Sequence, residues 1–148
     1  MGINGDNKGV AVSSRDGRLL LEIPASLESV DRAVETARAF FSRGRGRANL
    51  FPVLTSLREA LINAAVHGCA LDGSLWVRCQ LGVEDGMALV EVSDPGPGFD
   101  WRGLPPRSPA PEMVSGRGLA ILNHYSRKLH FNDKGNEVVF MVDLEARS

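Results

Sequence analysis

The chain of 148 residues has the length of one ordinary domain, and its 43% hydrophobic residues suffice for a core. A formal net charge of -1 excludes the strong positive field typical of proteins that bind nucleic acid or anionic membranes. Two cysteines are too few for a disulfide framework, and the sequence has no apolar run of membrane-spanning length and no signal peptide at its start. We therefore expect a cytoplasmic protein without direct contact to nucleic acid or membrane.

The first elements expected along the chain are a hairpin and a helix. Asp16-Gly17 lies between two short apolar runs and predicts the tight turn of a hairpin over residues 10–23. Ser26 is a suitable N-cap for a helix over residues 27–41. Apolar residues recur in this helix at three- and four-residue spacing and predict one buried stripe, made of Leu27, Val30, Val34, Ala37 and Phe41.

A glycine- and arginine-rich loop over residues 42–48 separates this helix from a second one. Three arginines crowd into the loop, where solvated side chains are the favoured interpretation and a local binding patch is the alternative. The second helix is expected from residue 49 or 50 to His67, and Gly68 is a fitting terminator.

The second half of the chain is expected to contain two further hairpins, a lid and a third helix. Residues 100–115 hold four prolines, which exclude a regular element and favour a lid or binding loop. The expected elements are strands over 75–83 and 87–92, a helix from about 116 to 125, and strands over 128–131 and 137–143. Strands and helices without βαβ alternation predict an antiparallel or mixed sheet with helices on one face.

A first group of polar residues lies on one face of the second expected helix. Glu59, Asn63 and His67 follow one another at four-residue spacing, which places them in one row. Burying polar groups without partners is costly, so such a row in an otherwise apolar helix needs a reason, and a ligand site would supply one. A row of solvated side chains is the alternative.

A second group follows the strand expected over residues 87–92. Asp94 continues the parity of the core-facing residues of that strand, so its carboxylate is expected on the core side. Gly96 and Gly98 would let a ligand approach the backbone closely. The carboxylate could accept a hydrogen bond from the exocyclic amine of adenine, whereas a tight turn capped by Asp94 is the alternative.

The third group, Gly116-Arg117-Gly118-Leu119, opens the last expected helix. A Gly-x-Gly sequence at a helix N-terminus offers free N–H groups and the positive end of the helix dipole, which suit phosphate. Loop flexibility alone would explain these glycines equally well. Together, however, the three groups supply a polar helix face, an amine-reading carboxylate and a phosphate cradle.

The three groups resemble the N, G1 and G2 boxes of the GHKL ATPase superfamily, whose ATP site is built on the Bergerat fold. The resemblance covers about residues 18–143. It implies an α+β fold, namely a two-layer α/β sandwich with a mixed, mostly antiparallel sheet and helices on one face. With it we expect one ATP-binding kinase domain over residues 10–148, with its lid at 100–115, after a flexible N-terminus over 1–9.

The resemblance also implies roles for individual residues. Glu59 takes the place of the catalytic base, Asn63 that of the asparagine that coordinates Mg²⁺, and Asp94 that of the aspartate that reads adenine. The nucleotide site is completed by Gly96, Gly98, Gly116, Gly118 and Leu119, and Arg117 is our own addition as a phosphate contact. Many members carry a Gly-Thr pair in the last hairpin, where this chain has Gly135 and Asn136, so no residue is assigned there.

Within the superfamily, a chain of this length with a short lid is most similar to the anti-sigma-factor serine kinases. The resemblance implies a homodimeric serine/threonine protein kinase that uses ATP and Mg²⁺. Its substrate would be a serine of an anti-anti-sigma, STAS-like partner, with a sigma factor as a second candidate partner, and it would regulate transcription by partner switching. A non-catalytic, ATP-gated binding module and a simple ATPase are the alternatives. No phosphoacceptor-histidine helix is recognisable, which disfavours an autophosphorylating histidine kinase.

Overall fold

The computed structural model describes residues 10–43, 49–98 and 116–144. Six strands form one sheet in the order β1-β2-β3-β4-β6-β5. Every strand pairing in the described residues is antiparallel. Along the chain the elements are β1 (Ala11–Arg15), β2 (Arg18–Pro24), α1 (Leu27–Ser42), α2 (Phe51–Ile62), the π-helix η1 (Asn63–Gly68), β3 (Trp76–Glu84), β4 (Met87–Ser93), α3 (Gly116–Tyr125), β5 (Arg127–Phe131) and β6 (Glu137–Asp143).

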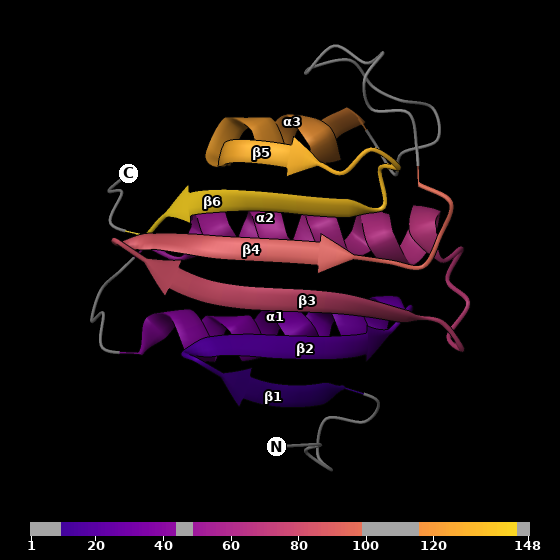
Figure 1. The fold of residues 1–148 in the computed structure, drawn as a ribbon, viewed down its shortest axis with the longest axis horizontal. Helices are drawn as coiled ribbons and strands as arrows, with labels where there is room; N and C mark the ends of the chain where they lie inside the picture. The colour runs from indigo at the N-terminus through magenta and orange to yellow at the C-terminus, as the bar shows by residue number, and fades with distance from the viewer. Residues whose placement is uncertain (1–9, 44–48, 99–115, 145–148) are drawn as a thin grey trace.

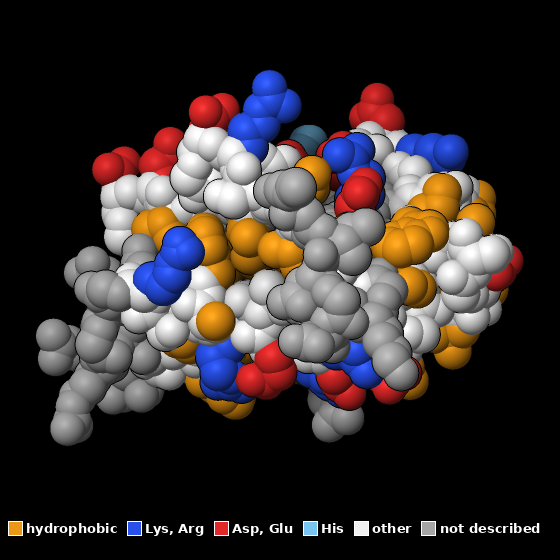
Figure 2. Space-filling view, turned by 90° about the horizontal axis from the view of Figure 1, so that it is seen from below, with side chains coloured by type: hydrophobic (Ala, Val, Ile, Leu, Met, Phe, Trp, Pro, Cys, Tyr) orange, Lys and Arg blue, Asp and Glu red, His pale blue; other side chains and the backbone are white. Residues whose placement is uncertain are grey.

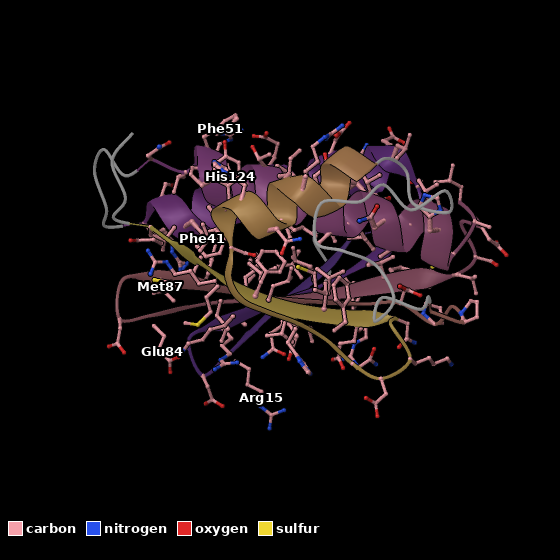
Figure 3. The ribbon with its side chains drawn as sticks, turned by 90° about the horizontal axis from the view of Figure 1, so that it is seen from above. Arg15, Phe41, Phe51, Glu84, Met87 and His124 are labelled. Carbon is pink, nitrogen blue, oxygen red and sulfur yellow. The ribbon has the colours of Figure 1, made fainter. Side chains whose placement is uncertain are left out.

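The helices cover one face of this sheet. In Figure 1 the strands lie in front of α1 and α2, and α1 lies behind β2 and β3. Figure 3 gives an edge-on view in which Phe51 and His124 lie on the helix side and Arg15 and Glu84 on the opposite side of the sheet. This arrangement confirms the predicted two-layer α+β sandwich.

The hydrophobic core lies between the sheet and the helices because alternate strand residues point to the helix side. In β4, Ala88, Val90 and Val92 are buried, and Phe140 of β6 and Phe41 of α1 are among the largest fully buried side chains. Figure 2 shows the molecule from the β1 side. Hydrophobic side chains gather across the middle of this view, between charged side chains above and below.

Helix α1 begins as the sequence predicts. The side chain of Ser26 accepts a hydrogen bond from the backbone N–H of Ser29 at 3.1 Å, which satisfies one of the free donors of the first turn. The predicted stripe is correct from Val30 onward, but Leu27 is 49% exposed. Leu27 lies in the first turn, immediately after the N-cap, and its side chain does not join the buried stripe.

The second predicted helix is wrong in one respect, because its last part is not α-helical. Helix α2 ends at Ile62, and η1 continues it as a π-helix to Gly68. The backbone N–H of Cys69 donates to the carbonyl of Ala64 at 2.9 Å, a five-residue spacing. A π-helix inserts an extra residue into the helical turn and is frequently found at functional sites.

Three predictions lie outside the described residues. These are the flexible N-terminus over 1–9, the lid over 100–115, and the positions of Arg45 and Arg47 in the loop after α1. Arg43, at the C-cap of α1, is described, and its guanidinium lies 5.7 Å from the centre of the Phe40 ring. Within the described ranges, no helix has both the length and the hydropathy needed to cross a membrane.

Candidate functional site

The candidate site lies at the end of the sheet where β4 stops. The turn between β5 and β6 lies at this same end (Figure 1), and residues 132–136 of that turn contact the chain after β4. The backbone N–H of Asp94 donates to the carbonyl oxygen of Asn136 at 3.0 Å. Two segments 42 residues apart in sequence are therefore joined by hydrogen bonds at this end of the sheet.

Asp94 is half-buried, and its carboxylate faces the end of η1. The backbone N–H of Gly96 donates to its Oδ1 at 2.7 Å. A Cβ on Gly68 would lie 2.4 Å from Cγ of Asp94, so the carboxylate packs directly on the Gly68 backbone. Burial raises the pKa of the Asp94 carboxyl above its ordinary value, and the Gly96 N–H and the positive charge of Lys134 oppose that rise.

Gly96 and Gly98 pack closely against neighbouring backbone. A Cβ on Gly96 would lie 2.0 Å from the carbonyl oxygen of Gly68, and one on Gly98 would lie 1.8 Å from the carbonyl oxygen of Lys134. Gly98 also has a φ of +80°, which favours glycine. Neighbouring backbone thus occupies the position that a Cβ would take, so glycine is needed at both positions for the Asp94 turn to pack closely. Their assignment to the nucleotide site stays a prediction.

Asn136 completes this turn, a role that is not predicted from the sequence. Its Nδ2 donates to the carbonyl oxygens of Asp94 at 2.9 Å and of Gly96 at 3.3 Å. The only signal in the sequence is the pair of asparagines that flank the turn at 132 and 136, a residue type that hydrogen-bonds nearby backbone. The sequence likewise predicts Gly68 only as a helix terminator.

The first group of polar residues lies where α2 gives way to η1. Glu59 is in the last turn of α2 and half-buried, Asn63 is the first residue of η1, and His67 is exposed near its end. Oδ1 of Asn63 is buried and has no hydrogen-bond partner. A buried amide oxygen without a partner is costly, so an external donor or cation is expected to bind it.

That oxygen suits Mg²⁺, which prefers oxygen ligands and keeps some of its coordination sites for water and phosphate. Among the described residues there is no group of three or more histidine, cysteine or acidic side chains that could hold a metal ion.

The third group lies at the start of α3. This helix begins at Gly116, so the segment Gly116–Leu119 forms its first turn, as predicted from the sequence. The side chains of Arg117 and Leu119 lie outside the described part of the structure, and their roles stay predictions. Helix α3 packs beside α2, and an edge-to-face contact between Tyr125 and Phe51, with ring centres 6.0 Å apart, joins the two helices. Leu122 of α3 is buried.

Fold and sequence together define a GHKL-type α+β sandwich. The sequence profile described as "Histidine kinase-like ATPase domain" matches residues 23–142. The chain belongs to this family of ATP-binding domains. A comparison with curated protein sequences found no match.

Among solved structures, the chain is similar to the "Histidine kinase domain from Erythrobacter litoralis EL346 blue-light activated histidine kinase". The two share 18% sequence identity with a TM-score of 0.49. The match covers 82% of this chain and 62% of that chain, so this chain spans less than two thirds of the length of that domain.

Proposed function

We propose that this domain is a serine/threonine protein kinase of anti-sigma-factor type, which transfers the γ-phosphoryl group of ATP to a serine of a partner protein. The observation that carries the proposal is the pairing of Glu59 with Asn63 one turn later, where the Asn63 oxygen is buried without a partner. Pure nucleotide binding needs no general base, so a carboxylate at this position favours catalysis over a binding module.

In this proposal the adenine lies at the Asp94 end of the site. The Asp94 carboxylate accepts a hydrogen bond from the 6-amino group, and the phosphates lie toward η1 and the first turn of α3. Free N–H groups at the start of α3 suit the negative charge of phosphate. Asn63 would hold Mg²⁺ there, and the ion would offset negative charge on the phosphates.

The transfer step uses Glu59 as the general base. The serine Oγ forms a bond to the γ-phosphorus while the bond from that phosphorus to the bridging oxygen of ADP breaks. The hydroxyl proton passes to the Glu59 carboxylate. Positioning and charge stabilisation supply most of the acceleration in such reactions, and the base orients the attacking hydroxyl.

The partner we propose is an anti-anti-sigma, STAS-like protein, with a sigma factor as the second binding partner and partner switching as the regulatory outcome. We further propose a homodimer formed through the edge strand β1 or through α1. Sedimentation of the purified protein across a range of concentrations tests the dimer separately from the activity.

Replacing Glu59 by Gln tests the function. We expect phosphoryl transfer to the partner serine to fall by about 10²–10⁴-fold because the base is lost. The affinity for ATP should not change, because Glu59 is not assigned a contact with the nucleotide. Labelled ATP followed into protein and into free phosphate, together with calorimetric ATP titration, measures both quantities.

Arg58→Gln is a matched control on the same helix, because it only breaks an exposed ion pair with Asp31. If label appears only as free phosphate with every partner tested, the domain is a simple ATPase. If wild-type protein binds ATP but neither transfers nor hydrolyses it, the domain is an ATP-gated binding module. Transfer that is unchanged in Glu59→Gln would contradict the role of the base.

A further inference from the structure

We propose that Asn136 is a positioning residue that orients the Asp94 carboxylate and thereby sets the preference of the site for a 6-aminopurine. The inference rests on the proposed nucleotide site and adds to it a residue from the β5–β6 hairpin. It is carried by the hydrogen bonds that join the β5–β6 turn to the segment after β4.

The Asn136 side chain is fully engaged by the protein itself. Its Nδ2 carries two hydrogens, and the carbonyl oxygens of Asp94 and Gly96 accept them at 2.9 and 3.3 Å. Its Oδ1 accepts a hydrogen bond from Nδ2 of Asn132 at 2.9 Å. With both amide hydrogens used, Asn136 acts on Asp94 and leaves recognition of the base to the carboxylate.

Asn132 holds Asn136 in place before any ligand arrives. Oδ1 of Asn132 accepts the backbone N–H groups of Gly135, Asn136 and Glu137 at 2.8, 3.0 and 3.2 Å. These bonds tie the turn to a single side chain, so its conformation is set within the hairpin. Asn136 therefore presents a preorganised donor and acceptor to the Asp94 segment.

Asn136 fixes Asp94 on both sides of its backbone. The Asp94 N–H donates to the Asn136 carbonyl at 3.0 Å, and the Asp94 carbonyl accepts from the Asn136 side chain. The Gly96 N–H then holds Oδ1 of the carboxylate, and Gly68 limits its rotation on the other side. A carboxylate held in this way can direct its remaining lone pairs at one place, where a ligand amine would lie.

The test compares two nucleotides that differ only in the amine. Calorimetry measures the affinity for ATP and for purine riboside 5′-triphosphate, which lacks the 6-amino group, in wild type and Asn136→Ala. The 6-amino group of ATP can donate one hydrogen bond to the charged Asp94. We therefore expect wild type to bind ATP about 10- to 100-fold more tightly than purine riboside 5′-triphosphate. In Asn136→Ala we expect the preference to fall to less than about 3-fold, mainly through loss of affinity for ATP.

Val142→Ala is the stability control. Val142 is buried and pairs with Ala88 near the end of β6, whereas Asn136 immediately precedes the start of that strand. It should lower the thermal unfolding temperature and leave the nucleotide preference intact. Wild type that binds neither nucleotide would overturn the proposed function itself. Wild type that prefers ATP, with the same preference in Asn136→Ala, would overturn only the role of Asn136.

A second measurement serves if Asn136→Ala does not fold. In wild type, hydrogen exchange of the Gly96 backbone N–H reports on the turn that Asn136 holds. We expect ATP at saturation to slow this exchange more than purine riboside 5′-triphosphate at saturation. Equal protection by the two nucleotides would contradict a link between the turn and recognition of the amine.

Discussion

Two hairpin turns at opposite ends of the sheet use the same residue types in different ways. In the β1–β2 turn, Asp16 and Gly17 have φ values of 54° and 78°, and a Cβ on Gly17 would meet no atom within 4 Å. In the β5–β6 turn, Gly135 has a φ of 82°, and the neighbouring Lys134 carbonyl lies against Gly98 of another segment. The first turn only reverses the chain, whereas the second also shapes the segment that carries Asp94.

This difference separates local from long-range determinants of structure. An Asp-Gly pair between two strands specifies its turn through backbone preference alone. The β5–β6 turn depends on Asn132 and Asn136, whose side chains bond to backbone, and its contact with Asp94 exists only in the folded protein. Substitutions at matched positions in the two turns should therefore have unequal effects.

The largest expected effect follows from a pair of glycine substitutions. Gly98→Ala places a methyl group 1.8 Å from the Lys134 carbonyl at a positive φ, so backbone strain and a clash combine to cost about 2–5 kcal/mol. Gly17→Ala meets no atom and should cost only about 1–2 kcal/mol of backbone strain. Urea denaturation measures the loss of stability in both variants, and ATP affinity should fall only in Gly98→Ala.

Equal losses of stability in the two variants would show that the Asp94 segment can move away from the β5–β6 turn at little cost. The proposed preorganisation of Asp94 would then be wrong.

Replacing Asp94 by Asn should separate stability from binding. ATP affinity should fall about 10- to 100-fold, because a charged acceptor becomes neutral. Burial raises the pKa of Asp94, so the folded state binds this proton more tightly than the unfolded state does. The stability that Asp94 contributes is therefore present below its ordinary pKa of 3.8 and is lost as the pH rises through the raised value.

Asp94→Asn removes this loss, because asparagine does not titrate. The free energy of unfolding of the variant minus that of wild type should therefore increase with pH across that window. Urea denaturation at several pH values measures the difference. A difference that stays constant or decreases with pH would contradict the burial of Asp94.

The smallest expected effect concerns Lys134, at the tip of the β5–β6 turn. Its positive charge opposes the rise in the pKa of Asp94, so Lys134→Ala should raise that pKa further. Lys134 is exposed, so ATP affinity at pH 7 should fall less than about fivefold. Titration of ATP affinity against pH should give a midpoint shifted upward in the variant, and a downward shift would exclude an electrostatic contact with Asp94.

The sequence predicts the fold well because most of its elements have local signals. Ser26 marks the start of α1, Asp16-Gly17 marks the first turn, and alternation in residues 87–92 marks β4 and its buried face. The family resemblance adds the two-layer arrangement, which no single element specifies.

The inner construction of the site is less predictable. Spacing on an ideal α-helix placed His67 in line with Glu59 and Asn63, but the helix changes to a π-helix at Asn63 and that periodicity no longer applies. Glycine spacing indicated a close approach at 96 and 98 without identifying the Gly68 and Lys134 carbonyls as the groups that approach. Both outcomes depend on contacts between segments that are far apart in the sequence.

A deletion can test what the π-helix between Glu59 and Gly68 contributes to the site. Removing one residue from the stretch 64–67 should restore ordinary α-helical winding, because the wider π-turn accommodates one extra residue. The backbone on which the Asp94 carboxylate now packs at Gly68 would then be rebuilt, although no residue of the site had been substituted. The width of this one turn is therefore part of what supports Asp94, and the ATP affinity of the deletion variant measures its contribution.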